Sequence, residues 1–117
     1  MRPTVSAITT HVLDTSIGRP AAGVAVVLER RDAADAWLVV GRGETDGDGR
    51  VRSWRPEPAL VSATYRLTFD TRAYFAARGV DAFFPSVAIE FAVGDSQTHH
   101  HVPLLLSPFG YSTYRGS

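Results

Sequence analysis

The stretch Val87-Ala88-Ile89-Glu90-Phe91-Ala92-Val93 carries the pattern that decides the fold. Branched and aromatic side chains occupy every second position, and alanine or glutamate stands between them. Because side chains on a β-strand point alternately to the two faces of a sheet, this pattern predicts a strand with one face in a hydrophobic core. The stretch from Thr64 to Asp70 repeats the pattern, with Tyr65, Leu67 and Phe69 on the inward side.

Further strands are predicted on either side of these two. An inward row of Val24, Val26 and Leu28 marks one strand. Others are expected through residues 8–14, through residues 37–42 and, as a pair, through the C-terminal segment. Turn residues separate these segments, and seven or eight short strands in one chain are typical of a sandwich of two sheets.

One segment breaks the alternation. Residues 71–78 read Thr-Arg-Ala-Tyr-Phe-Ala-Ala-Arg and are followed by Gly79, which predicts a short helix closed by a glycine cap. A chain of 117 residues is long enough for one hydrophobic core. We therefore take residues 1–117 as a single all-β domain, a two-sheet sandwich of about eight strands with one short helix.

Composition excludes several classes of function. The twelve basic residues, all arginine, are balanced by twelve acidic ones, which argues against a nucleic-acid or membrane partner. Without lysine or cysteine, the chain has no Schiff-base lysine, no Walker-type phosphate loop, no disulfide and no thiolate metal ligand. No apolar run reaches membrane-spanning length, and residues 1–6 lack the apolar core of a secretion signal, so a cytoplasmic location is expected.

Three of the four histidines, His99, His100 and His101, stand together near the C-terminus. On a strand, His99 and His101 share one face and His100 takes the other. Imidazoles titrate near neutral pH, so this pair is a candidate for acid–base chemistry. It is also a candidate for zinc binding, which needs a third ligand and a supporting carboxylate. Surface histidines or a hydrogen-bonded core histidine are the structural alternatives.

The fourth histidine, His11, lies in the first predicted strand. Alternation places it on the face opposite Thr10 and Val12 and on the same face as Leu13. On that face it can join the C-terminal histidines in one site.

The segment Asp46-Gly47-Asp48-Gly49 begins like a calcium-binding loop. The fifth and sixth positions of such a loop require an oxygen ligand and a glycine, but here they are Arg50 and Val51. We therefore predict a tight turn that delivers Arg50 to the start of the next strand. Arg50 is either a solvated surface residue or a fixed cation for a planar or anionic substrate.

The C-terminal segment is unusually apolar. It combines Leu104-Leu105-Leu106 with Phe109, Tyr111 and Tyr114. Consecutive leucines on a strand point to both faces, which predicts an edge region covered by another subunit.

Several stretches along the chain form one combination: Thr10-His11-Val12-Leu13-Asp14, Asp46-Gly47-Asp48-Gly49-Arg50, Phe69-Asp70-Thr71 with Tyr74-Phe75, Phe83-Phe84-Pro85, His101-Val102-Pro103-Leu104-Leu105-Leu106-Ser107-Pro108 and Tyr114-Arg115-Gly116-Ser117. This combination resembles the transthyretin-like family, in its 5-hydroxyisourate hydrolase branch. The terminal Tyr114-Arg115-Gly116-Ser117 looks like the enzymes rather than the hormone carriers.

The resemblance implies an eight-stranded sandwich assembled as a homotetramer, a dimer of dimers, with active sites in the channel between dimers. It implies hydrolysis of the N1–C6 amide of 5-hydroxyisourate to 2-oxo-4-hydroxy-4-carboxy-5-ureidoimidazoline, on the route from urate to allantoin. That reaction needs no metal and no cofactor. The matched catalytic positions are His11, Arg50 and His101, and the matched substrate-binding positions are His11, Arg50, Tyr114, Arg115, Gly116 and Ser117.

We therefore expect His11 and His101 to form an acid–base pair, with either one activating water, while Arg50 holds the substrate and the oxyanion. Two rival hypotheses remain. A small-ligand carrier would share the fold without catalysis, although its channel has no use for two histidines and an arginine. A zinc-dependent amide hydrolase would instead use His99 and His101.

Overall fold

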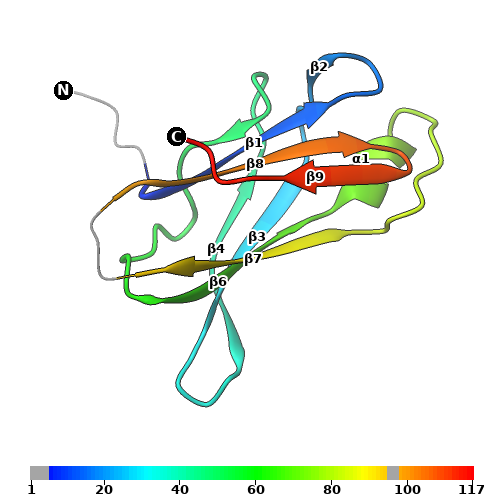
Figure 1. Cartoon of the computed structure of the whole chain (residues 1–117). Helices are drawn as coiled ribbons and strands as arrows, with labels where there is room; N and C mark the ends of the chain where they lie inside the picture. Colours follow the sequence, from blue (N-terminus) through cyan, green and yellow to red (C-terminus); the bar gives the residue numbers. More distant parts are fainter. Residues whose placement is uncertain (1–5, 95–97) are drawn as a thin grey trace.

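The computed structural model describes residues 6–94 and 98–117 and packs them into two β-sheets, one above the other (Figure 1). In chain order the elements are β1 (Ile8–Asp14), β2 (Arg19–Pro20), β3 (Ala25–Arg31), β4 (Trp37–Glu44), β5 (Arg50–Val51), β6 (Ala63–Phe69), α1 (Thr71–Ala76), β7 (Val87–Val93), β8 (His100–Ser107) and β9 (Gly110–Thr113). The predicted sandwich is confirmed, and two of the nine strands that the described residues form are only two residues long.

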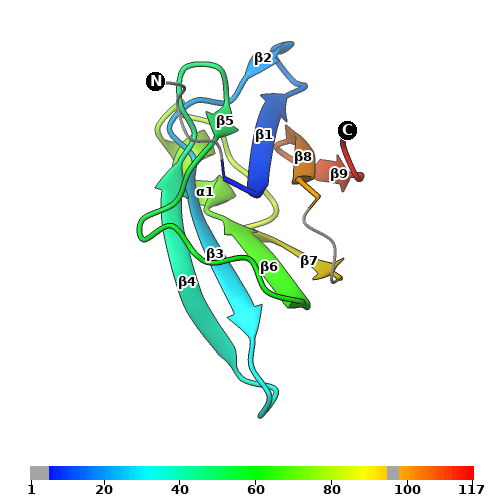
Figure 2. The ribbon, with the colours of Figure 1, turned by 90° about the vertical axis from the view of Figure 1, so that its left-hand side faces the viewer.

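The two sheets differ in how they are connected. One has the strand order β4-β3-β6-β7, and the other has the order β2-β1-β8-β9 with β5 also paired to β1 (Figure 2). Within the second sheet, β1 and β8 run parallel, and Thr9 lies opposite His101. The first and the eighth strands are thus neighbours, which brings the two histidine-bearing segments of the sequence together.

The core lies between the inner faces of the sheets. Alternation predicted its members correctly, since Val24, Val26, Leu28, Tyr65, Leu67, Phe69, Val87, Ile89 and Val93 are all buried. Full burial of a side chain of this size stabilises a fold by about 1.5–3 kcal/mol. Phe91 is only partly buried and stacks on Tyr65, with ring centroids 6.0 Å apart.

Trp54 holds β5 against the rest of the sandwich. Its indole is buried, and Nε1 donates to the carbonyl oxygen of Ile8 at 2.8 Å. On the facing strand β4, Gly41 leaves room for Trp54, because an added Cβ at position 41 would lie 2.7 Å from Cβ of Trp54. The chain that follows β5 is thereby anchored to β1.

The single helix that the described residues form is shorter than predicted. It ends at Ala76 instead of Arg78. Gly79 does have the expected left-handed conformation, with φ of 71°, and Val80 N–H donates to the carbonyl oxygen of Phe75 at 2.9 Å. Across the part of the chain that the structure describes, no helix is long and apolar enough to span a membrane.

The prediction that the three leucines lie in an edge region is wrong. They belong to β8, which pairs with β1 on one side and β9 on the other. Leu104 and Leu106 face the core, and Leu105 is only partly buried on the outer face. The edge strand is β9, and the exposed aromatic residues Phe109, Tyr111 and Tyr114 lie on or beside it.

Candidate functional site

A tight turn places Arg50, as the sequence predicts. Oδ1 of Asp46 accepts hydrogen bonds from the backbone N–H of Asp48 at 2.9 Å and of Arg50 at 3.0 Å. Gly49 has a φ of 76°, and a Cβ there would collide with the carbonyl oxygen of Val12. The turn therefore packs directly on β1, and Arg50 becomes the register partner of His11.

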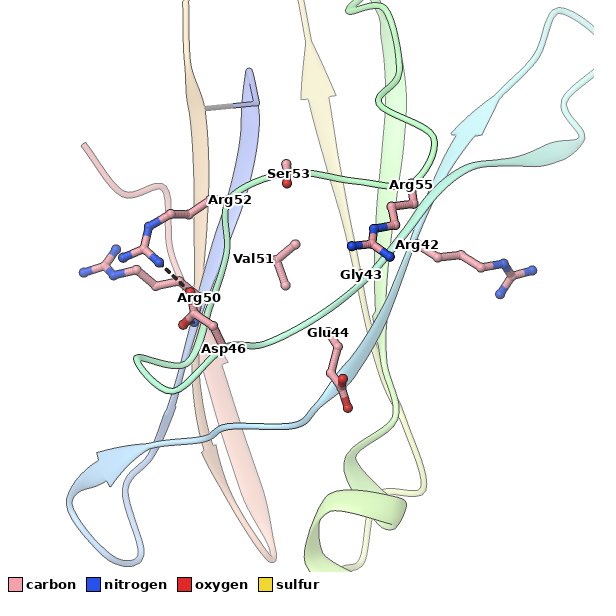
Figure 3. Close-up of a pocket in the computed structure, with 9 residues that line it drawn as sticks. All are labelled: Arg42, Gly43, Glu44, Asp46, Arg50, Val51, Arg52, Ser53 and Arg55. Atoms are coloured by element: carbon pink, nitrogen blue, oxygen red, sulfur yellow. Dashed lines mark hydrogen bonds and ion pairs between the residues drawn. The ribbon is translucent and has the colours of Figure 1, made fainter. Parts of the chain in front are cut away.

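The side chain of Arg50 points to the outer face of this sheet. Figure 3 shows Arg50 and Arg52 on one side of β5 and the buried Val51 on the other. Arg52 is ion-paired with Asp46 and Asp48, whereas Arg50 has no carboxylate within ion-pair distance among the described residues. Of these two arginines, the half-buried Arg50 is therefore the one whose guanidinium can pair with a ligand.

A hollow of about 560 Å³ lies between β4 and β5, and its lining includes four arginines. Figure 3 shows how their side chains lie. Arg55 points toward this space, while Arg42 points away from it and Arg50 and Arg52 turn to the outer face of the sheet. Because these guanidinium groups diverge, the hollow does not focus positive charge on one point.

His101 is held on three sides. Its Nδ1 lies 2.8 Å from Oγ1 of Thr9, and the same hydroxyl lies 2.8 Å from Nε2 of His99. The backbone N–H of Gly116 donates to the carbonyl oxygen of His101 at 2.8 Å, and Gly116 lies against the imidazole ring. As predicted, His99 and His101 share one face, with nearly parallel rings, while His100 is buried on the other.

A cavity of about 190 Å³ lies at the meeting point of β1, β5, β8 and the C-terminal tail. It is lined by Thr9, Thr10, Arg50, Val51, Arg52, His99, His101 and Ser117. The structure thus brings together Arg50, His101 and Ser117, three of the predicted site residues.

The other predicted site residues lie around this cavity rather than in its lining. His11 stands beside it, paired with Arg50. Gly116 contacts His101 directly. Tyr114 and Arg115 line a separate hollow of about 290 Å³, together with residues 89–92 of β7, and His101 borders this hollow as well.

The surroundings keep both candidate histidines neutral near pH 7. Burial, followed by the positive charge of Arg50 and the neighbouring His99 and His11, lowers the pKa of His101. Burial and then Arg50 also lower the pKa of His11, against the opposing effects of the Asp48 carbonyl and the nearby carboxylates. A neutral imidazole can accept a proton, which is the property a general base needs.

The donor set does not form a metal centre. Within residues 6–94 and 98–117, no group of three or more His, Asp or Glu side chains is placed to hold an ion. His99 and His101 instead both contact the hydroxyl of Thr9.

Sequence reasoning missed the part that Thr9 plays. The signal was available, because alternation puts Thr9 on the outer face with His11 once Thr10 and Val12 are assigned to the core. What the pattern could not show is that a parallel pairing with β8 would set Thr9 beside His101.

A model of the HIUase/Transthyretin family matches residues 8–116. The chain is similar to the 5-hydroxyisourate hydrolase of Caulobacter vibrioides, with 48% identity over 97% of this chain and 100% of that protein. With the mouse 5-hydroxyisourate hydrolase the identity is 42%, over 96% of each protein.

The chain is similar in structure both to a 5-hydroxyisourate hydrolase and to a transthyretin. The structure of Klebsiella pneumoniae 5-hydroxyisourate hydrolase superimposes with a TM-score of 0.79 at 40% identity, covering 94% of this chain and 98% of that one. Sea bream transthyretin in complex with thyroxine gives a TM-score of 0.86 at 28% identity, covering 94% of both chains.

Proposed function

The chain belongs to the HIUase/Transthyretin family, and on that premise we propose that it hydrolyses 5-hydroxyisourate to 2-oxo-4-hydroxy-4-carboxy-5-ureidoimidazoline in urate breakdown. A similar backbone serves the thyroxine-bound sea bream transthyretin, so the fold alone does not distinguish enzyme from carrier. The observation that carries the proposal is the site itself. Two imidazoles with lowered pKa values flank a guanidinium that has no carboxylate partner among the described residues, beside one small cavity.

In the proposed mechanism, water attacks the C6 carbonyl of the substrate ring. One of His11 and His101 takes the proton from that water, and the other returns a proton to the departing ring nitrogen. Arg50 donates to the oxyanion that forms at the carbonyl oxygen, and one such donor is typically worth about 3–4 kcal/mol of transition-state stabilisation. No step in this scheme calls for a metal or a cofactor.

The C-terminal tail completes the proposed site. Gly116 and Ser117 close the cavity beside His101, and we assign Tyr114 and Arg115 to substrate binding as well. Within one chain, Tyr114 and Arg115 line the neighbouring hollow, so their contribution to substrate binding depends on assembly. We propose a homotetramer, a dimer of dimers, in which partner chains cover the edge strand β9 and the exposed Phe109 and Tyr111.

Residues 1–117 act as a single hydrolase domain. The enzyme works in the cytoplasm, a location that stays a prediction from the sequence.

The test is the ultraviolet decay of 5-hydroxyisourate, generated from urate by urate oxidase, with and without the protein. We expect the decay rate to rise in proportion to protein concentration and to return to the spontaneous rate in Arg50→Ala and His101→Ala. Decay at the spontaneous rate with the folded wild-type protein present would overturn the hydrolase and favour the carrier. Arg42→Ala is the matched control, because Arg42 lies on β4 and its side chain points away from the site.

A further inference from the structure

The hydroxyl of Thr9 joins two histidines. Oγ1 of Thr9 lies 2.8 Å from Nε2 of His99 and 2.8 Å from Nδ1 of His101, and the threonine is only 5% exposed. The parallel register of β1 and β8 sets Thr9 directly opposite His101, and His99 stands just before the first residue of β8. This arrangement is not required by the fold, since a valine at position 9 would suit a strand equally well.

A single hydroxyl has one proton, and that limits what this trio can do. When His101 donates from Nδ1 to Thr9, the hydroxyl proton points to His99, and Nε2 of His101 has a free lone pair. When the hydroxyl instead donates to Nδ1 of His101, Nε2 of His99 carries a hydrogen and donates it to Oγ1 of Thr9. In that state Nε2 of His101 also carries a hydrogen, so it has no free lone pair. The state of one histidine therefore sets the tautomer of the other.

We propose that Thr9 and His99 are positioning residues that form a proton relay behind His101, an inference that rests on the hydrolase function proposed above. When Nε2 of His101 takes a proton from the attacking water, its Nδ1 proton passes to Oγ1 of Thr9. The hydroxyl proton passes at the same time to Nε2 of His99. His101 and Thr9 end with as many protons as they began with, and His99 carries the added proton and its charge.

The placement of the charged groups favours this direction of transfer. His101 is half-buried, and Arg50 on β5, His11 on β1 and His99 all disfavour a positive charge on it. Arg52 also lines the cavity, but its charge is offset by Asp46 and Asp48. His99 is exposed, so water can solvate a positive charge there. The relay moves the charge from the half-buried His101 to the solvent-exposed His99.

Three variants test the relay. Thr9→Val removes the hydroxyl while keeping the shape, and we expect kcat to fall at least about 10-fold with KM nearly unchanged. Thr9→Ser restores the hydroxyl and should recover most of kcat. His99→Gln, at an exposed position, can still hydrogen-bond to Thr9 but cannot accept the proton, so kcat should fall although the fold is undisturbed. Thr68→Val, on β6 of the other sheet, is the control that should leave kcat unchanged.

A measurement without substrate separates this inference from the hydrolase function. Nitrogen-15 NMR of the histidine side chains should show His101 as the Nδ1–H tautomer in the wild type and in Thr9→Ser, and as a mixture of tautomers in Thr9→Val. An active wild-type enzyme whose Thr9→Val and His99→Gln variants keep kcat, the pH profile and the His101 tautomer would overturn the relay alone. A wild-type protein without hydrolase activity would overturn the proposed function instead.

Discussion

Gly116 lies flat against the imidazole of His101. A Cβ at position 116 would stand 2.6 Å from Cδ2 of that ring, and the Gly116 N–H donates to the His101 carbonyl oxygen at 2.8 Å. The φ of Gly116 is not in the left-handed region, so close approach, rather than backbone freedom, is the reason for glycine here.

This contact predicts that Gly116→Ala displaces either the tail or the ring of His101. We expect kcat/KM to fall about 10- to 100-fold, because small displacements of a reacting group are costly. The melting temperature should stay close to that of the wild type, since the tail lies outside the core. Gly94→Ala, just after the end of β7, is the matched control, because a Cβ there would meet no described atom within 4 Å. Equal activities of the two variants would contradict this account.

Deleting Tyr114 to Ser117 should abolish turnover and leave the sandwich folded. The deletion removes the cover of His101 and one wall of the cavity but none of the residues that form the core. Circular dichroism would report the fold, and the decay of 5-hydroxyisourate would report turnover. Turnover near the wild-type level after the deletion would refute a role for the tail.

Acidification should weaken both activity and stability. The lowered pKa values of His11 and His101 mean that, below about pH 6.5, the unfolded chain binds more protons than the folded one. The stability that these neutral imidazoles contribute is present above that pH and is lost as the pH falls through the folded-state pKa values. Urea unfolding at pH 7.5 and pH 5.5 should show a smaller acid loss in His11→Gln than in the wild type. The value of kcat/KM should likewise decrease as the pH falls below about 6.5.

The buried pair of Tyr74 and Asp14 predicts sensitivity to alkali. The Tyr74 hydroxyl on α1 donates to Oδ2 of the buried Asp14 at 2.8 Å, and burial together with this carboxylate raises the pKa of Tyr74 to about 12. The corresponding stability is present below pH 10 and is lost as the pH rises toward 12.

Tyr74→Phe should lower the free energy of unfolding at pH 8 by about 1–3 kcal/mol, because it leaves the buried carboxylate oxygen without this donor. It should also reduce the loss of stability between pH 8 and pH 11, and kcat should stay unchanged. Urea denaturation at both pH values checks the first two expectations. A variant as stable as the wild type would show that this bond adds nothing to stability.

Dialysis against a chelator should leave hydrolysis intact, since the proposed chemistry uses only His11, His101 and Arg50. The rival zinc enzyme would lose activity on dialysis and regain it with added Zn²⁺. Metal analysis of the purified protein, run beside the activity assay, distinguishes the two. Activity that disappears with the metal and returns with it would replace our mechanism with the zinc-dependent one.

The sequence by itself determined the strands and the face that each residue takes. Alternation is a local property with a period of two, so the inward row of Tyr65, Leu67 and Phe69 could be read without knowing which strands pair. The turn before Arg50 was equally local, because Asp46 and Gly49 act on backbone groups within four residues. Resemblance to a family, rather than any local pattern, singled out His11, Arg50 and His101 together.

Only the tertiary structure decided how these residues meet. The position of β8 between β1 and β9 is a long-range pairing, and local patterns do not encode it; for this reason the leucines of β8 were wrongly assigned to an edge. The same pairing sets Thr9 against His99 and His101, some ninety residues away in the chain. The properties of these imidazoles depend on burial and on nearby charges, which exist only once the sheet has formed.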